Sequence, residues 1–244
     1  MSKHLSVIVP AYNEAQRGTI KTTLESFQNY FTRQSYSWEV IVVSDGSKDQ
    51  TVEIVSEFIS NKPEFSLIAN TQNFGKGYVV RQGMLAATGD YRIFVDADNA
   101  ISIEQIEKFW PYINEGYEIV IGSIELPGAK IEENAQWYRR FFGKYSKYII
   151  RVIAGLWNIH DTQRAFKLFT AQSAAEIFSR TTINRWGFDI EVLILAKKLG
   201  YKIKELPITW INYGESRVNL GSYFGVLRDL FKMRINLLFG KYKL

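Results

Sequence analysis

The chain has 244 residues, of which 46% are hydrophobic and 23% are charged, an ordinary balance for a globular protein. No uninterrupted apolar run reaches the roughly 18 to 20 residues that a membrane-spanning helix needs. The chain contains no cysteine, which excludes disulfides, thiol catalysis and thiolate metal sites.

The net charge of +5 is unevenly distributed along the chain. Residues 1–138 contain 11 basic and 18 acidic side chains, whereas residues 139–244 contain 19 basic and 7 acidic ones. This asymmetry indicates that the second half meets an anionic partner. No recognised nucleic-acid-binding module is present, so we expect that partner not to be nucleic acid.

The first half alternates strand-like and helical segments. Apolar runs predict strands at 5–9, 38–43, 65–69, 92–95 and 117–121. Helical spacing predicts helices at 19–31, up to about 59, through Arg81 and Met84, and up to about 114. Ser47 with Gln50, and Ser102 with Gln105, match the capping-box pattern. This alternation predicts an α/β fold with a mainly parallel, doubly wound sheet.

Two acids, Asp96 and Asp98, stand where the fourth predicted strand ends. Ligands of such sheets bind beyond the carboxyl ends of the strands, and residues i and i+2 of an extended segment point the same way. Oxygen ligands without Cys or His suit Mg²⁺ or Mn²⁺. A strand end at Asp96 with a helix cap at Asp98 would also explain the pair, so the tripeptide alone leaves both interpretations open.

The second half is less regular, and its helices carry unusual faces. In the predicted helix 137–157, Arg140, Lys144, Lys147 and Arg151 line one side beside an aromatic and aliphatic stripe. The closing helix, 223–239, repeats the arrangement. Such helices suit a membrane interface; alternatively, the apolar stripe packs on the core and the cations are solvated. The remaining predicted elements are strands at 165–169, 201–203 and 208–211 and helices at 172–178 and 188–199.

Four motifs in this order resemble the family 2 glycosyltransferases, which have the GT-A fold. They are Val-Pro-Ala-Tyr-Asn-Glu at 9–14, Val-Ser-Asp-Gly-Ser at 43–47, Asn-Phe-Gly-Lys-Gly at 73–77 and Asp-Ala-Asp at 96–98. The motifs at 161–167 and 185–191 are similar to the polyprenyl-phosphate branch, dolichyl-phosphate β-glucosyltransferases first and mannosyltransferases next. The resemblance implies one GT-A domain, with residues 1–122 binding the nucleotide sugar and residues 123–244 facing the acceptor and the membrane.

The resemblance also implies a set of site residues. Those expected near the donor nucleotide are Pro10, Ala11, Tyr12, Glu14, Asp45, Lys76 and Asp96. Asp96 and Asp98 would bind the cation, and Arg217 would approach the diphosphate. Asp161 and Gln163 would approach the sugar and the acceptor phosphate, and the candidates for holding the lipid phosphate are Arg139, Arg140 and Arg164.

Three positions depart from the family pattern. Gly122-Ser123 runs into Ile124-Glu125 where an arginine is frequent, and Arg164-Ala165 stands where a small residue and glycine are usual. Ala100 cannot supply the third side-chain ligand of some mannosyltransferases. Acceptor contacts are therefore less firmly implied than donor contacts.

Together with the acids at 96 and 98, the resemblance implies a metal-dependent, inverting transfer of glucose from UDP-glucose to a polyprenyl or dolichyl phosphate. The chain opens Met-Ser-Lys-His without a signal-peptide pattern. With a lipid phosphate as acceptor, we expect a peripheral protein on the cytoplasmic membrane face. A phosphate nucleophile is already anionic, so Asp161 would position it and would act as general base only toward a hydroxyl acceptor. The alternatives are GDP-mannose as donor, a soluble glycan as acceptor, and a non-catalytic nucleotide-sugar-binding protein at the membrane.

Overall fold

A computed structural model describes residues 4–132, 153–211 and 220–243. The described strands build a seven-stranded sheet of order β3-β2-β1-β4-β7-β5-β8 and a two-stranded sheet of β6 and β9. The strands are β1 (Leu5–Ala11), β2 (Trp38–Ser44), β3 (Phe65–Ala69), β4 (Tyr91–Phe94), β5 (Ile119–Ser123), β6 (Lys130–Glu132), β7 (Lys167–Thr170), β8 (Ile203–Pro207) and β9 (Thr209–Ile211). The helices are α1 (Thr19–Phe31), α2 (Thr51–Ile59), α3 (Lys76–Ala86), α4 (Trp110–Asn114), α6 (Ala171–Phe178), α7 (Phe188–Lys198) and α8 (Leu220–Leu238).

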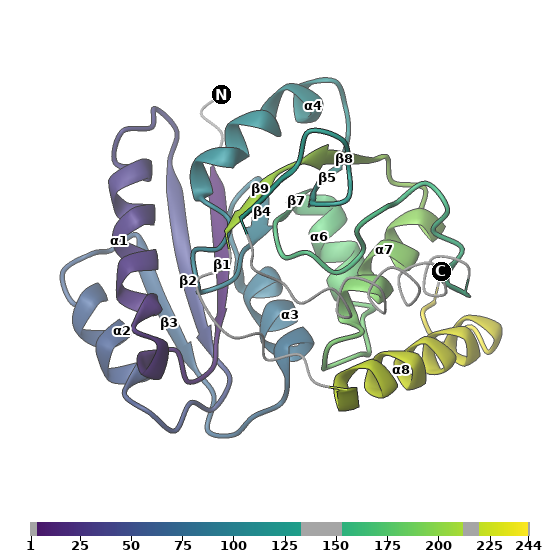
Figure 1. Cartoon of the computed structure of the whole chain (residues 1–244), viewed down its shortest axis with the longest axis horizontal. Helices are drawn as coiled ribbons and strands as arrows, with labels where there is room; N and C mark the ends of the chain where they lie inside the picture. The colour runs from purple at the N-terminus through teal and green to yellow at the C-terminus, as the bar shows by residue number, and fades with distance from the viewer. Residues whose placement is uncertain (1–3, 133–152, 212–219, 244) are drawn as a thin grey trace.

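Helices cover both faces of the large sheet (Figure 1). Side chains alternate along each buried strand: Val7 and Val9 join the core under α1, whereas Ile8 between them joins the core under α3, α6 and α7. Because both faces are covered, the central strands are apolar throughout, as expected for a parallel sheet with helices on each side. The prediction of an α/β fold with a mostly parallel sheet is confirmed.

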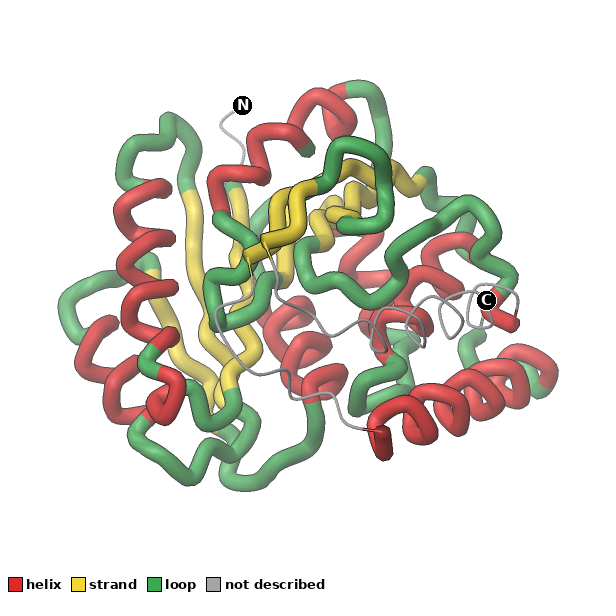
Figure 2. The backbone as a smooth tube through the Cα atoms, viewed as in Figure 1, coloured by secondary structure: helices red, strands yellow, loops and turns green. Residues whose placement is uncertain are grey.

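One strand runs against the others. β7 is antiparallel to both of its neighbours, β4 and β5, and Lys167 at its amino end pairs with Phe94 at the carboxyl end of β4. The loop before β7 therefore opens on the same sheet edge as the loops that follow β1, β2, β4 and β5. Figure 2 shows loops gathered at the lower edge of the sheet.

The capping-box predictions were wrong. Helix α2 begins at Thr51 without a side-chain cap, and Ser102 gives no side-chain cap to the 3-10 helix η2 (Ile103–Lys108). The Ser47 hydroxyl instead accepts the backbone N–H of Asn13, at 3.1 Å. The Ser47 hydroxyl, which the pattern assigned to the start of α2, is therefore bonded to the loop after β1.

The carboxylate of Glu191, in the first turn of α7, connects three segments of the chain. It is fully buried and accepts the N–H groups of Thr182 and Ile183 and, at 2.7 Å, the hydroxyl of Tyr242. Burial and the Glu191 carboxylate raise the pKa of the Tyr242 hydroxyl, which stays protonated as a donor at neutral pH. Glu191 thus helps to attach the chain after α8 to the core, in which the Tyr242 ring is also buried.

We expect Tyr242→Phe to lower the free energy of unfolding by about 1.5–3 kcal/mol, because a hydrogen bond to a buried charged acceptor is lost. Urea unfolding at neutral pH measures this change. Tyr117→Phe is the matched control, since the Tyr117 hydroxyl donates no hydrogen bond to the residues that the structure describes and the ring is only half-buried. Equal unfolding midpoints for the two variants would contradict the role given to Glu191.

Candidate active site

The two acids after β4 point out of the core. Ala97 between them is buried, and its carbonyl accepts the Thr23 hydroxyl at 2.8 Å, which fixes the loop against α1. The side chains of Asp96 and Asp98 remain 40% and 32% exposed. Burial raises the pKa of Asp98 above its ordinary value, and the neighbouring Asp96 carboxylate raises it further. Two carboxylates with this mutual repulsion form a ready site for a cation.

Each of these carboxylates also faces a protein cation. The Lys76 ammonium, at the start of α3, contacts Asp96, and an Arg17 guanidinium nitrogen lies 4.0 Å from Asp98. Burial lowers the pKa of Lys76, but the carboxylates of Asp96 and Asp189 outweigh this effect and leave the pKa raised. Lys76 therefore stays protonated at neutral pH, and its positive charge at the sheet edge can bind an anionic ligand.

The donor set fits a hard divalent ion. Within the described parts of the chain, no three acidic, histidine or cysteine side chains gather as a metal cage. Mg²⁺ needs no such cage, because it binds through one or two carboxylates and takes its other oxygen ligands from water and substrate phosphates. Asp96 and Asp98 supply that pair, and both are partly exposed.

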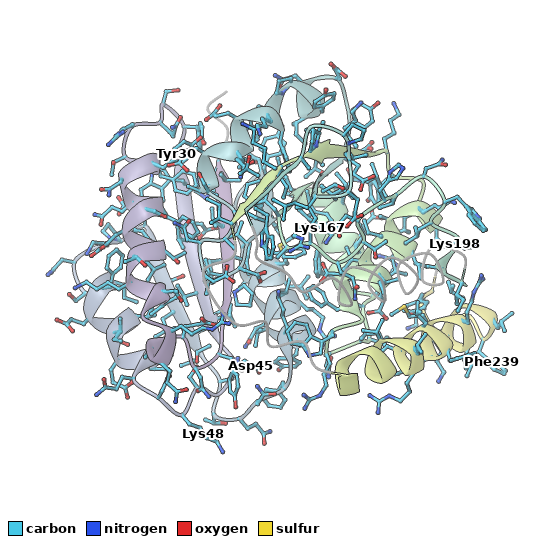
Figure 3. The ribbon with its side chains drawn as sticks, viewed as in Figure 1. Tyr30, Asp45, Lys48, Lys167, Lys198 and Phe239 are labelled. Carbon is cyan, nitrogen blue, oxygen red and sulfur yellow. The ribbon has the colours of Figure 1, made fainter. Side chains whose placement is uncertain are left out.

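The 73–77 loop is held by Asp45. Its carboxylate, 4% exposed, accepts the backbone N–H of Phe74 at 2.7 Å and of Gly75 at 3.0 Å, together with the Asn73 side-chain amide at 2.9 Å. The Asp45 carboxylate is thus occupied by the loop that carries Lys76. Asp45 lies at the lower edge of the molecule in Figure 3, near Lys48.

The glycines on either side of Lys76 allow another segment to approach. Gly75 has φ +104°, and a Cβ there would lie 2.4 Å from the carbonyl oxygen of Asn184. A Cβ at Gly77 would lie 2.5 Å from the carbonyl oxygen of Ile183. Both positions therefore require glycine for close packing, and Trp186 in this segment lies with its ring 5.8 Å from the Lys76 ammonium.

The residues after β1 line the same edge. Pro10 and Ala11 are buried in the strand, and Tyr12 is half-buried. Glu14 is 6% exposed, its N–H donates to the Thr51 hydroxyl at 2.9 Å, and its carboxylate accepts the Thr19 hydroxyl at 3.4 Å. The loop is thus anchored to the starts of α1 and α2, and the nucleotide contacts expected here stay predictions.

The loop before β7 carries Asp161, Gln163 and Arg164. Asp161 is 1% exposed, and its carboxylate accepts the N–H groups of Ile124 and Gln163, both at 3.3 Å. The Arg164 Nε lies 3.6 Å from the same carboxylate, and its guanidinium lies 4.7 Å from the ring centre of Trp210. Gln163 is exposed. Asp161 is therefore placed to order this loop, and its expected contact with sugar or acceptor stays a prediction.

Comparison with known proteins shows the family of the chain. The model of the family described as glycosyl transferase family 2 matches residues 6–178. The chain belongs to this family. Its relatives include a dolichyl-phosphate beta-glucosyltransferase of Trichomonas vaginalis, 34% identical over 96% of this chain and 74% of that protein. The human dolichyl-phosphate beta-glucosyltransferase is 30% identical over 100% of this chain and 78% of its own length.

Solved structures share the fold of this family 2 glycosyltransferase. Glucosyl-3-phosphoglycerate synthase of Mycobacterium tuberculosis, in complex with Mn²⁺, UDP and glucosyl-3-phosphoglycerate, aligns with a TM-score of 0.69 at 18% identity, over 96% of this chain and 79% of that one. Mannosyl-3-phosphoglycerate synthase of Rubrobacter xylanophilus aligns with a TM-score of 0.71 at 14% identity, over 99% and 76%. The GT-A-like fold expected from the motifs is confirmed.

The glycosyltransferase site contains residues to which the sequence analysis assigned no role. Lys167 and Asp189 form a buried ion pair at 2.6 Å beside the Lys76 group, and Arg17 and Trp210 face Asp98 and Arg164. The available signal was a charge inside an apolar run, as at Lys167 in Phe-Lys-Leu-Phe. Arg139, Arg140 and Arg217 lie outside the described residues, and their roles stay predictions.

Asp45→Asn tests whether this acid acts through the loop. In this variant one of the two oxygens becomes an NH₂ group, which cannot accept a hydrogen bond from the N–H groups of the 73–77 loop. We therefore expect the free energy of unfolding to fall by about 1–3 kcal/mol. Urea unfolding without nucleotide measures this loss. Weakened UDP binding with an unchanged unfolding midpoint would instead assign Asp45 to direct nucleotide contact alone.

Proposed function

We propose that this glycosyltransferase moves glucose from UDP-glucose to the phosphate of a polyprenyl lipid of the dolichyl type. The observation that carries the proposal is the pair of partly exposed carboxylates, Asp96 and Asp98, with the Lys76 ammonium in contact with Asp96. Relatives of the chain are named dolichyl-phosphate beta-glucosyltransferases, which supports the choice of donor and acceptor. UDP as the nucleotide is supported by similar folds that hold UDP, such as the mycobacterial synthase.

The chain's own cations and acids would prepare the donor for departure. Asp98, with Asp96, would hold Mg²⁺ or Mn²⁺, and such an ion neutralises the charge that develops on a departing diphosphate. Lys76, which stays charged, would bind the phosphate oxygens when Asp96 turns to the ion. Arg217 would add further donors to the same oxygens.

The acceptor side needs positioning more than proton transfer. A lipid phosphate is an anion at neutral pH, so it attacks without a general base. Asp161, already hydrogen-bonded within its loop, would keep Gln163 and Arg164 in place, and Arg139, Arg140 and Arg164 would bind the phosphate. One displacement on an α-linked donor then inverts the anomeric carbon and yields a β-linked lipid phosphate sugar.

The proposed place of the reaction is the cytoplasmic face of a membrane. A polyprenyl phosphate presents its head group at the bilayer surface, and the basic second half of the chain suits that anionic surface. In the same proposal, residues 1–122 bind the nucleotide sugar and residues 123–244 bind the acceptor and face the membrane.

The test combines donors with one carboxylate variant. The protein is incubated with Mg²⁺, polyprenyl phosphate and radiolabelled UDP-glucose or GDP-mannose, and label in the organic phase is counted. We expect transfer from UDP-glucose, reduced at least about a hundredfold in Asp98→Asn, because a group that holds charge at the transition state is removed.

Asp90→Asn is the matched control, since Asp90 is exposed before β4, at the opposite sheet edge. Its transfer rate should equal that of the unchanged protein. Undiminished transfer by Asp98→Asn would remove this carboxylate from the reaction. Transfer from GDP-mannose alone would overturn the choice of donor, and label confined to the aqueous phase would overturn the lipid acceptor.

A further inference from the structure

Strand β9 is fixed to the segment that follows the two candidate metal ligands. The N–H of Ile211 donates to the carbonyl oxygen of Ala100 at 2.9 Å. The side-chain amide of Gln105 accepts the N–H of Thr209 at 2.7 Å and donates to the Thr209 carbonyl at 2.8 Å. Trp210 stands between these two anchored residues, so its backbone position is set by the chain that follows β4.

The Trp210 side chain contacts an arginine of a different loop. The Arg164 guanidinium carbon, from the loop before β7, lies over the Trp210 ring, 4.7 Å from its centre. A guanidinium is attracted to the face of an aromatic ring, and Trp offers the most favourable face. The ring restricts where the guanidinium can lie and leaves the N–H groups along its edge available.

The Arg164 side chain keeps hydrogen-bond donors for a ligand. Its Nε–H is buried, and none of the residues that the structure describes accepts a hydrogen bond from it. The Asp161 carboxylate lies 3.6 Å from the Arg164 Nε, beyond ordinary hydrogen-bond distance, and already accepts two backbone N–H groups. The Arg164 side chain is 24% exposed. A buried donor without an acceptor is unfavourable, so this group favours the arrival of an anion.

The main chain at Arg164 is held from the other direction. Its carbonyl oxygen accepts a hydrogen bond from the ammonium of Lys167, which is buried and ion-paired with Asp189. The core therefore fixes the backbone of Arg164, and β9 fixes its guanidinium. A side chain held at both ends loses little conformational freedom on binding, which favours a bidentate contact with phosphate.

We infer that Trp210 is a positioning residue for the acceptor: its ring holds the Arg164 guanidinium where that group binds the phosphate that attacks the sugar. The inference rests on the proposed function and adds a residue that reaches the reaction only through Arg164. A path of direct contacts joins the two parts of the site, since the N–H of Ala100 also donates to the Asp98 carboxylate at 3.1 Å.

The geometry of displacement favours the acceptor over the donor as the ligand of Arg164. In a single displacement, the attacking phosphate and the departing diphosphate lie on opposite sides of the anomeric carbon, so each anion needs its own cation. Lys76 and the proposed ion serve the diphosphate. Arg164 lies on another loop, which opens on the same sheet edge because β7 is antiparallel to β4.

The test is steady-state transfer from UDP-glucose, with Mg²⁺, to a short-chain isoprenyl phosphate dissolved in buffer. We expect Trp210→Leu to raise the KM for the isoprenyl phosphate about tenfold, because the guanidinium loses its aromatic support. The kcat and the KM for UDP-glucose should change less than about twofold, since other residues bind the donor. Trp210→Tyr keeps an aromatic face and should restore the KM to within about threefold of the unchanged value.

A double variant tests whether Trp210 acts through Arg164. Arg164→Gln alone should raise the KM for the isoprenyl phosphate at least about tenfold, because a charge-assisted hydrogen bond is lost. Adding Trp210→Leu should raise that KM no further. Effects that multiply would overturn the inference, because Trp210 would then act by another route. An unchanged KM in Arg164→Gln would overturn it as well.

Tyr112→Leu is the matched control. The Tyr112 ring is half-buried and lies 4.6 Å from the Lys204 ammonium, so this change removes another aromatic ring that supports a cation, on α4. Both KM values should stay as in the unchanged protein, and urea unfolding checks that each variant is folded. Should Trp210→Leu fail to fold, Trp210→Val carries the same expectation with a side chain that suits a strand. Equal KM values in the test and control variants would contradict the role of Trp210.

Calorimetry measures the phosphate contact without transfer. In the presence of Mg²⁺ and UDP, we expect Trp210→Leu to weaken binding of the isoprenyl phosphate about tenfold and to leave the affinity for UDP unchanged. This result in a protein that transfers no glucose would count against the proposed function alone. Weaker UDP binding with unchanged isoprenyl phosphate binding would overturn the inference and assign Arg164 to the donor. Failure of the unchanged protein to bind the isoprenyl phosphate would also overturn it.

Discussion

The active edge of this glycosyltransferase depends on one buried ion pair, Lys167 with Asp189. The two side chains are 0% and 5% exposed, and the Lys167 Nζ lies 2.6 Å from the Asp189 Oδ1. Removing one member of such a pair typically costs about 3–5 kcal/mol, because the other charge is left uncompensated in the interior. The pair joins the first residue of β7 to the first turn of α7. Burial lowers the pKa of Lys76, and the Asp96 carboxylate, helped by Asp189, raises it above its ordinary value. Lys76 is thereby kept as a cation beside Asp96.

The regular part of the fold could be predicted from the sequence because its determinants are local. The apolar runs of β1 and β2 predict strands that are buried on both faces, and the acids after β4 mark the sheet edge where a ligand would bind. The position of β7 could not be predicted in this way. Its segment has the composition of a strand, but its antiparallel insertion between β4 and β5 depends on contacts with residues more than 40 positions away. The failed cap at Ser47 has a similar origin, since the competing Asn13 N–H comes from another loop.

The candidate site shows the same limit at the level of single carboxylates. Spacing was enough to expect Asp96 and Asp98 on one side of a loop, because direction along an extended segment follows from covalent geometry. A position directly after a predicted strand could not distinguish these acids from Asp45, which also follows one. Asp45 and Asp161 are buried and surrounded by N–H donors from their own or neighbouring loops. These N–H donors determine whether a carboxylate is available to a ligand or is already bonded to the backbone. Local sequence patterns do not predict where such donors lie in the folded protein.

Charge and position together explain why a fold that binds a soluble nucleotide sugar can serve an insoluble acceptor. The proposed donor side combines the carboxylates of Asp96 and Asp98, on the loop after β4, with the ammonium of Lys76, the first residue of α3. On the side proposed for the acceptor, helix α8 has one face packed on the protein and another exposed. Because Asp229 and Tyr242 tie that helix to Gly187 and Glu191, the orientation is set by the same α7 turn that carries Asp189. The first turn of α7 and the residue before it thus contact β7 through the Lys167–Asp189 pair, α8 through Gly187, and the segment after α8 through Glu191.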